Sequence, residues 1–313
     1  MKIVLLESLA VSDSVMEQYL QPLRDAGHRV ETYERTMESR ILKERTRDAD
    51  VIILANMPLS GEVIDSCEKL KFIDVAFTGV DHIALDHAKE KGVAVSNASG
   101  YSNNSVAELV LGMTLSLLRN VRQVEERCRT GKTKDGLVGM ELKGKTVGII
   151  GTGAIGFCVA ELFHGMGCSV IAYDVCEKPV PYITYMGLEE VLRQADIVTL
   201  HCPLTEETKG MFHAERIAML KQGAYFINAA RGPVVDSQAL AQALNEGRLA
   251  GAGIDVFEME PPLPEDHPLL HAKNCLVTPH IAFASKESMI LRAEIVFRNL
   301  WEWMKGNQIN KVL

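Results

Sequence analysis

The order of apolar and polar positions predicts strands and helices that alternate along the whole chain. Short apolar segments rich in Val and Ile alternate with longer segments in which apolar residues recur every three to four positions. In the first part of the chain, strands are predicted at residues 2–7, 28–33, 50–55, 72–77 and 93–97. Strands that are apolar throughout and separated by helices are typical of a parallel sheet with both faces covered.

A second series of the same kind follows, with strands predicted at residues 146–150, 169–173, 197–200, 225–228, 253–256 and 275–278. A last helical segment, about 286–305, has no sheet of its own left to cover, so we expect it to pack on the first series. The sequence therefore predicts an α/β fold of two doubly wound parallel-sheet domains. We expect one domain at residues 1–98 plus 284–313, and the other at 99–283.

Two capping-box spacings predict where helices begin. Ser14 with Glu17 is expected to open a helix that Gly27 closes. Ser105 with Glu108 is expected to open a long helix, apolar at first and charged later, that reaches about residue 129.

Composition narrows the function classes. Of the 313 residues, 47% are hydrophobic and 24% charged, as in an ordinary globular protein, and the net charge is −8. An acidic protein lacks the basic face that nucleic acids and anionic membranes require, so we expect neither as a partner. No segment has the roughly 20 consecutive apolar residues of a membrane span. The seven cysteines occur singly, which favours a reducing, cytoplasmic location.

A glycine-rich turn follows the predicted strand at 146–150. Gly151, Gly153 and Gly156 form a Gly-x-Gly-x-x-Gly motif between this strand and a predicted helix. The first glycine permits a tight turn, the second lets the backbone approach a pyrophosphate, and the third lets helix and strand pack closely. The helix N-terminus then offers its amides to the phosphates. Ala154 and Ile155 complete the predicted phosphate-binding turn.

Asp174 strengthens the prediction of a dinucleotide site. It ends the next strand, 18 residues after Gly156, where an acid can accept hydrogen bonds from a ribose diol. Val175 and Cys176 follow it, with no arginine for a 2′-phosphate, so NAD is favoured over NADP. The motif alone leaves open an unliganded glycine turn and a methyltransferase that uses S-adenosylmethionine.

A second phosphate-binding pattern lies beside the first. Residues 139–146 match the P-loop pattern formally, ending in Lys145 and Thr146. A functional P-loop leads into a helix, whereas Lys145 and Thr146 begin a predicted strand. We therefore interpret this match as coincidental.

Three polar residues follow later strands of the second domain: Arg231, Glu260 and His280. Ligands of open α/β sheets bind beyond the carboxyl ends of the strands, where these side chains are expected. Each alone would more often be structural, but together they could bind a carboxylate and transfer a proton.

With these motifs in this order, the sequence resembles the D-isomer-specific 2-hydroxyacid dehydrogenase family. The resemblance covers nearly the whole chain, through residues 78–81 (Thr-Gly-Val-Asp), 144–151, 229–232 and 278–280 (Thr-Pro-His). It implies a Rossmann NAD domain and a flavodoxin-like substrate domain, with the active site between them and hinges near 97–101 and 280–284. It also implies a homodimer formed through the NAD domain.

The resemblance implies a role for each polar residue. His280 gives a proton to the keto oxygen while hydride passes from nicotinamide, Glu260 orients the imidazole and favours its protonated form, and Arg231 binds the substrate carboxylate. Backbone amides of Thr78, Gly79 and Val80 grip the same carboxylate. The cofactor contacts implied are Cys202, Pro203 and Thr208 on the adenosine side, Ala229, and Asp255 at the nicotinamide carboxamide. The mechanism needs no metal.

Departures from the commonest family pattern concern the substrate. Tyr101 and Phe283 resemble the branch of D-lactate and D-2-hydroxyisocaproate dehydrogenases, in which Tyr101 could reach the substrate carboxylate. Met57 stands where phosphoglycerate dehydrogenases have an arginine, which predicts a small non-phosphorylated 2-ketoacid. His82 replaces a common asparagine and receives no role. The alternative function is a catalytically silent, NAD(H)-sensing protein like the corepressors that share this scaffold. The sequence does not specify which 2-hydroxyacid the enzyme would use.

Overall fold

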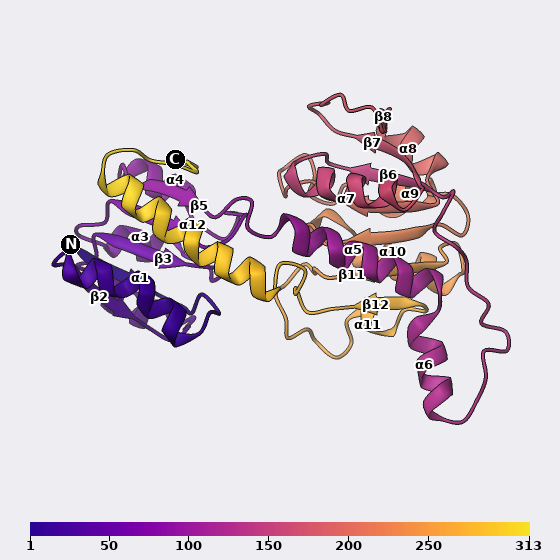
Figure 1. The fold of residues 1–313 in the computed structure, drawn as a ribbon, viewed down its shortest axis with the longest axis horizontal. Coiled ribbons are helices and arrows are strands. Elements are labelled where there is room, and N and C mark those ends of the chain that lie inside the picture. The colour runs from indigo at the N-terminus through magenta and orange to yellow at the C-terminus, as the bar shows by residue number, and fades with distance from the viewer. The chain divides into compact units, whose positions relative to one another are not determined.

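The computed structural model describes all residues from Met1 to Leu313. The chain divides into two compact units, each built around one parallel β-sheet (Figure 1). The first unit comprises Met1–Ser102 and Ala284–Leu313, and the second comprises Asn103–Phe283. The predicted fold class, two parallel-sheet α/β domains, is confirmed.

The first unit holds a five-stranded sheet of order β2-β1-β3-β4-β5, in which all neighbours are parallel. This is the flavodoxin-like order. The strands are β1 (Lys2–Leu5), β2 (Arg29–Thr32), β3 (Val51–Leu54), β4 (Phe72–Val75) and β5 (Ala94–Asn97), all at predicted positions. The helices are α1 (Asp13–Asp25), α2 (Ser39–Thr46), α3 (Gly61–Ser66), α4 (Leu85–Glu90) and α12 (Lys286–Met304). Strands β3 and β4 are buried along their whole length; β3 is wholly apolar, whereas β4 includes the buried Asp74.

The C-terminal helix α12 packs on the first unit, as its position after the last strand of the second sheet predicted. It contacts β4, β5 and α1 (Figure 1, yellow). Phe297 stacks on Tyr19 with ring centroids 4.8 Å apart, and Trp303 stacks on Phe72 at 4.7 Å. Large aromatic contacts of this kind bury enough apolar area to hold a helix that is distant in sequence.

The second unit holds a seven-stranded parallel sheet of order β12-β11-β10-β9-β6-β7-β8. Its strands are β6 (Thr146–Ile150), β7 (Ser169–Tyr173), β8 (Ile183–Tyr185), β9 (Ile197–Leu200), β10 (Tyr225–Asn228), β11 (Gly251–Ile254) and β12 (Cys275–Val277). The helices are α5 (Asn103–Leu118), α6 (Val121–Arg129), α7 (Ala154–Gly165), α8 (Leu188–Gln194), α9 (Ala214–Ala218), η1 (Gly232–Val234), α10 (Ser237–Asn245) and α11 (Pro268–His271). The edge strand β8 was not predicted, because it is three residues long and buries only Ile183.

Neither predicted capping box lies at a helix N-cap, because both helices begin earlier in the chain than predicted. The N-cap of α1 is Ser12, whose hydroxyl accepts from the Val15 amide at 3.4 Å, so Ser14 lies inside the helix. Helix α5 already begins at Asn103, which places Ser105 in its first turn. The long helix predicted to reach residue 129 is two helices, separated at Asn120, which has a left-handed φ of 51°.

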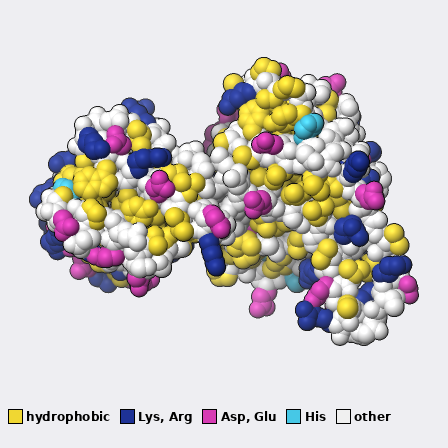
Figure 2. Space-filling view, viewed as in Figure 1, with side chains coloured by type: hydrophobic (Ala, Val, Ile, Leu, Met, Phe, Trp, Pro, Cys, Tyr) yellow, Lys and Arg dark blue, Asp and Glu magenta, His cyan; other side chains and the backbone are white.

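The surface carries charges of both signs. Figure 2 shows Lys and Arg side chains interspersed with Asp and Glu on the face in view of each unit. No helix combines the length and the apolar character that crossing a membrane requires.

Candidate active site

The glycine turn between β6 and α7 has the geometry of a phosphate-binding turn. Gly151 has φ of 94°, and a Cβ there would lie 2.7 Å from the Cys202 amide nitrogen. A Cβ at Gly156 would lie 2.0 Å from the Gly151 carbonyl oxygen. Gly153, in contrast, has no heavy atom within 4 Å of its Cβ position, and no side chain caps α7. The residues therefore fit a pyrophosphate that approaches the open backbone at Gly153 and the amides of the α7 N-terminus.

Asp174 lies next to this turn and is ionised. Its carboxylate accepts hydrogen bonds from the Thr152 hydroxyl at 3.1 Å and from the Cys176 amide at 2.8 Å, and also from the Thr152 amide. Burial alone would raise the pKa of Asp174, but these hydrogen bonds outweigh it and hold the pKa below its usual value. A fixed negative charge here suits a ribose diol and repels a phosphate. Val175, which follows, is 92% exposed and uncharged, while the charge of Lys178 also helps to lower the pKa of Asp174.

The loop after β9 forms an uncharged wall beside Gly151. Burial lowers the pKa of His201 to about 3, so the imidazole is neutral, and its Nε2 lies 2.9 Å from the Thr199 hydroxyl. Burial raises the pKa of the Cys202 thiol to about 11. The Thr208 hydroxyl donates to the Pro203 carbonyl at 2.6 Å, which closes the loop on itself.

The structure brings Glu260 and His280 together. His280 follows β12 and Glu260 follows the adjacent strand β11, so both stand beyond the carboxyl ends of the sheet. The His280 Nδ1 lies 3.0 Å from both carboxylate oxygens of Glu260. A proton on Nδ1 is thus directed at Glu260, which leaves Nε2 to exchange a proton with another group. His280 also has a left-handed φ of 56°, an uncommon conformation for a residue other than glycine.

Asp255 explains how the His280 loop keeps this conformation. The Asp255 carboxylate is fully buried and accepts from the Thr278 hydroxyl at 2.6 Å and from the Ile281 and Ala282 amides at 2.8 Å each. Its carbonyl accepts from the His280 amide at 2.8 Å. Burial raises the pKa of Asp255, while these hydrogen bonds act in the opposite direction. This anchoring was missed from the sequence; the contact with a nicotinamide carboxamide stays a prediction.

Arg231 is held by a tight turn after β10. The Asn228 side-chain amide donates to the Arg231 carbonyl at 3.0 Å, and the Arg231 Nη1 donates to the Ala230 carbonyl at 2.8 Å. A Cβ at Gly232 would lie 1.8 Å from the Phe257 carbonyl oxygen. The turn that carries Arg231 therefore contacts, backbone to backbone, the segment that leads to Glu260. Asn228 and Gly232 were not identified as site residues from the sequence.

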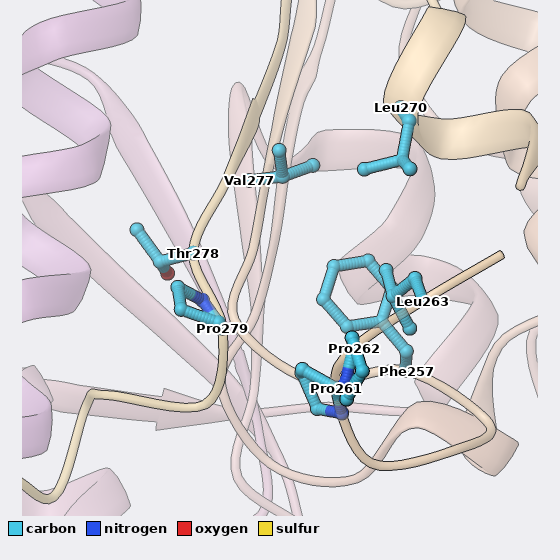
Figure 3. Close-up of a pocket in the computed structure, with 8 residues that line it drawn as sticks. All are labelled: Phe257, Pro261, Pro262, Leu263, Leu270, Val277, Thr278 and Pro279. Atoms are coloured by element: carbon cyan, nitrogen blue, oxygen red, sulfur yellow. The ribbon is translucent and has the colours of Figure 1, made fainter. Parts of the chain in front are cut away.

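An apolar pocket of about 250 Å³ adjoins the Glu260 and His280 loops (Figure 3). Pro261 and Pro262 follow Glu260 directly, and Pro279 precedes His280. The lining residues are Phe257, Pro261, Pro262, Leu263, Leu270, Val277, Thr278 and Pro279. Phe283, beyond His280, meets the imidazole edge to face, with ring centroids 5.4 Å apart. The pocket beside the His280 loop is therefore apolar, whereas the carboxylates near the imidazole are Glu260 and the buried Asp255.

The predicted substrate residues of the first unit follow β3, β4 and β5. Thr78, Gly79 and Val80 are half-buried, and the buried Thr78 hydroxyl has no hydrogen-bond partner. Tyr101 is 4% exposed, with its ring centroid 6.3 Å from that of Phe77. The Met57 side chain is fully buried.

His82, to which no role was assigned from the sequence, lies beside these residues. Its Nε2 is 2.8 Å from the Ala55 carbonyl oxygen, and its ring meets Phe77 edge to face with centroids 6.2 Å apart. It thus joins the loops that follow β3 and β4.

Comparison with known proteins agrees with this geometry. Residues 111–282 match the family model described as D-isomer specific 2-hydroxyacid dehydrogenase, NAD binding domain. A hydroxypyruvate reductase of Blautia hydrogenotrophica is 37% identical, over 86% of this chain and 86% of its own. An aromatic 2-oxoacid reductase of Clostridium sporogenes is 38% identical, over 83% of this chain and 85% of its own.

Among solved structures, the D-lactate dehydrogenase of Aquifex aeolicus, complexed with NAD and lactic acid, is 30% identical with a TM-score of 0.86. The match covers 98% of this chain and 96% of that one. The chain therefore belongs to the D-isomer specific 2-hydroxyacid dehydrogenases, a family of NAD-dependent oxidoreductases, and carries the family's NAD binding domain.

Proposed function

We propose that this protein reduces a small, non-phosphorylated 2-oxoacid to the D-2-hydroxyacid with NADH. The observation that carries the proposal is the His280–Glu260 pair, with 3.0 Å between Nδ1 and each carboxylate oxygen. The pair stands at the same edge of the sheet as the glycine turn and Asp174. A proton donor beside a dinucleotide site is the arrangement that reduction of a carbonyl requires.

The glycine turn and Asp174 would hold NADH, which would supply the hydride that C2 of the substrate accepts. His280 delivers the proton to the C2 oxygen from Nε2, because Nδ1 is directed at Glu260. Glu260 fixes the imidazole orientation and stabilises its positive charge before transfer. Arg231 binds the substrate carboxylate through two guanidinium N–H groups and polarises the neighbouring carbonyl. In the reverse direction, His280 takes the proton back from the hydroxyl.

The first unit contributes the remaining substrate contacts. We assign the amides of Thr78, Gly79 and Val80 to the carboxylate, together with the Tyr101 hydroxyl. Met57 is buried and apolar, so it offers nothing to a substrate phosphate. The relatives' names support a common carboxylate end with differing side chains, since they specify hydroxypyruvate and aromatic 2-oxoacids.

The test is NADH oxidation with glyoxylate, hydroxypyruvate, pyruvate and phenylpyruvate, with 3-phosphohydroxypyruvate as the phosphorylated control. We expect turnover of at least one unphosphorylated acid, a D-configured product on chiral chromatography, and little turnover of the phosphorylated acid. A preference for the phosphorylated acid would refute the proposed substrate class. Tight NADH binding without turnover of any acid would instead support the silent sensor.

We also propose a homodimer formed through the second unit. Helix α6 has no buried residue, and the segment around it exposes Val121, Val138 and Met140. Apolar side chains of this kind favour burial against a second copy. Sedimentation should give twice the mass of one chain, and a monomer at micromolar concentration would contradict the proposal.

A further inference from the structure

A buried arginine on α12 contacts the predicted substrate residue Tyr101. Arg292 is only 3% exposed, and its Nη2 donates to the Leu9 carbonyl at 2.7 Å. The guanidinium carbon lies 5.7 Å from the centroid of the Tyr101 ring. The two side chains interact directly, and a hydrogen bond from Arg292 to Tyr101 is among the causes that act to raise the pKa of Arg292. Arg292 thus connects the loop after β1 with Tyr101, which follows β5.

A buried carboxylate, Glu7, acts on the pKa of Arg292 through its charge, although its own ion pair is with Arg35 at 3.9 Å. Glu7 is 6% exposed, and one of its oxygens accepts from the Ala55 amide at 2.7 Å and from the Met57 amide at 2.9 Å. Burial lowers the pKa of Arg292, and its interactions with Tyr101 and Glu7 oppose this effect. These groups lie beyond the carboxyl ends of β1 and β3, at the point where the strand order reverses. Ligands bind at this place in doubly wound sheets.

Stability alone gives little reason for a charge in this position. Removing a charged group from water is costly even when a carboxylate lies nearby, and apolar residues of similar size often replace buried charged groups without loss. A buried arginine at the ligand edge of a sheet therefore suggests a role in orienting a neighbouring group.

The hydrogen bond between Arg292 and Tyr101 has a fixed direction. A guanidinium has only donors, so the Tyr101 hydroxyl must be the acceptor. The hydroxyl has one proton of its own, which must then be donated elsewhere. Because Tyr101 is 4% exposed and its ring neighbours Phe77, the ring has little freedom to turn away. Arg292 thus leaves Tyr101 as a hydrogen-bond donor of defined orientation.

We propose that Arg292 is a positioning residue that presets the Tyr101 hydroxyl to donate to the substrate carboxylate. Arg292 itself does not touch the substrate in this scheme; it acts through Tyr101. The inference rests on the proposed function, because it takes a 2-oxoacid as the acceptor. A substrate carboxylate is the acceptor chemistry that a preset, neutral donor favours, since a hydrogen bond to a charged group is stronger than one between neutral groups.

The test is a double-mutant cycle of Arg292→Met and Tyr101→Phe, with NADH and the best 2-oxoacid of the wild type. Each single variant should raise the KM for the 2-oxoacid about ten- to a hundredfold, the effect of losing one hydrogen bond to a charged group. The value of kcat should change much less, and the Kd for NADH should stay as in the wild type. The double variant should show the effect of one single variant, because both remove the same hydrogen bond.

Two further variants separate positioning from folding. Arg298→Met on the exposed side of α12 is the matched control and should leave KM unchanged. Arg292→Lys keeps the charge but lacks the guanidinium fork, so its KM should lie between those of wild type and Arg292→Met. This variant also carries the test if Arg292→Met does not fold.

The inference would be overturned if the KM increases of the two single variants multiplied in the double variant. An Arg292→Met variant that lowers the melting temperature and kcat but leaves KM unchanged would also overturn it. If Arg292→Met does not fold, an Arg292→Lys variant with the KM of the wild type would refute the inference. A wild type that turns over no 2-oxoacid would refute the proposed function instead, so the two failures are distinguishable.

Discussion

Gly153 and Gly156 lie three residues apart in one turn, yet the structure predicts opposite consequences of adding a methyl group. The Cβ of Gly153→Ala would meet no heavy atom within 4 Å, and the backbone is extended with φ of −68°. The Cβ of Gly156→Ala would stand 2.0 Å from the Gly151 carbonyl oxygen. The first substitution fills space that we assign to the pyrophosphate, and the second forces the turn and the helix apart.

The magnitudes follow from these distances. Gly153→Ala should change the free energy of unfolding by about 0.5 kcal/mol or less, because nothing is displaced. A phosphate oxygen must approach a backbone amide to about 2.9 Å, and the new methyl group would obstruct that approach. Losing one such charge-assisted hydrogen bond costs about 1.5–3 kcal/mol, so the Kd for NADH should rise about ten- to a hundredfold. Gly156→Ala requires the turn and the helix to move apart by more than about 1 Å, which should lower the free energy of unfolding by about 1–3 kcal/mol.

The assay is urea unfolding of the variants together with titration of NADH by fluorescence. Gly165→Ala, at the far end of α7, is the matched control, since its Cβ would also have nothing within 4 Å. Gly165→Ala should leave both the free energy of unfolding and the Kd for NADH close to the wild-type values. A Gly153→Ala variant that binds NADH like the wild type would refute the assignment of the pyrophosphate to this turn. Equal stability of Gly156→Ala and the wild type would refute the packing argument.

Two other predictions concern buried or partly buried carboxylates. Asp174→Ala should relax the preference for NADH over NADPH, because the ionised carboxylate that repels a 2′-phosphate is gone; a constant ratio of the two kcat/KM values would contradict the ribose assignment. Burial raises the pKa of Asp74 well above 3.8 in the folded protein, although Asn299 donates a hydrogen bond to it. The stability linked to the protonated Asp74 carboxyl is therefore fully present below the pKa that Asp74 has in the unfolded chain. It is lost as the pH rises through the pKa that Asp74 has in the folded protein. Urea unfolding at several pH values should show a smaller loss of stability with rising pH for Asp74→Asn than for the wild type, and equal slopes would contradict this.

The parts of the fold that the sequence predicted depend on local patterns. Apolar strands separated by helices are evident from the order of residues, and so is the glycine turn with Asp174 eighteen residues after Gly156. The three glycines differ in the structure as the motif predicts, one at a tight turn, one open and one in close packing. The edge strand β8 has one buried residue, so its hydrophobic pattern is too short to indicate a strand.

The parts that the sequence could not predict depend on partners far apart in the chain. Arg292 and its acceptor Leu9 are 283 positions apart, and Asn299 is 225 positions from Asp74. Asp255 anchors a loop more than twenty residues later through its side chain and its backbone. No spacing rule connects such residues, because the connection arises only when the sheets form and bring strand ends together. The capping serines were misplaced for a different reason, since several polar residues near each helix start satisfy the same rule.

Proton donation by His280 is the central claim, and turnover by His280→Ala at saturating NADH and 2-oxoacid tests it most directly. The NADH titration is repeated on the same sample, so that loss of the cofactor site and loss of the proton donor are separated. We predict that kcat falls about 10²–10⁴-fold, the usual contribution of a general acid, while the Kd for NADH stays within a factor of about three. Turnover close to that of the wild type, with NADH bound normally, would contradict the account and remove His280 from the chemistry.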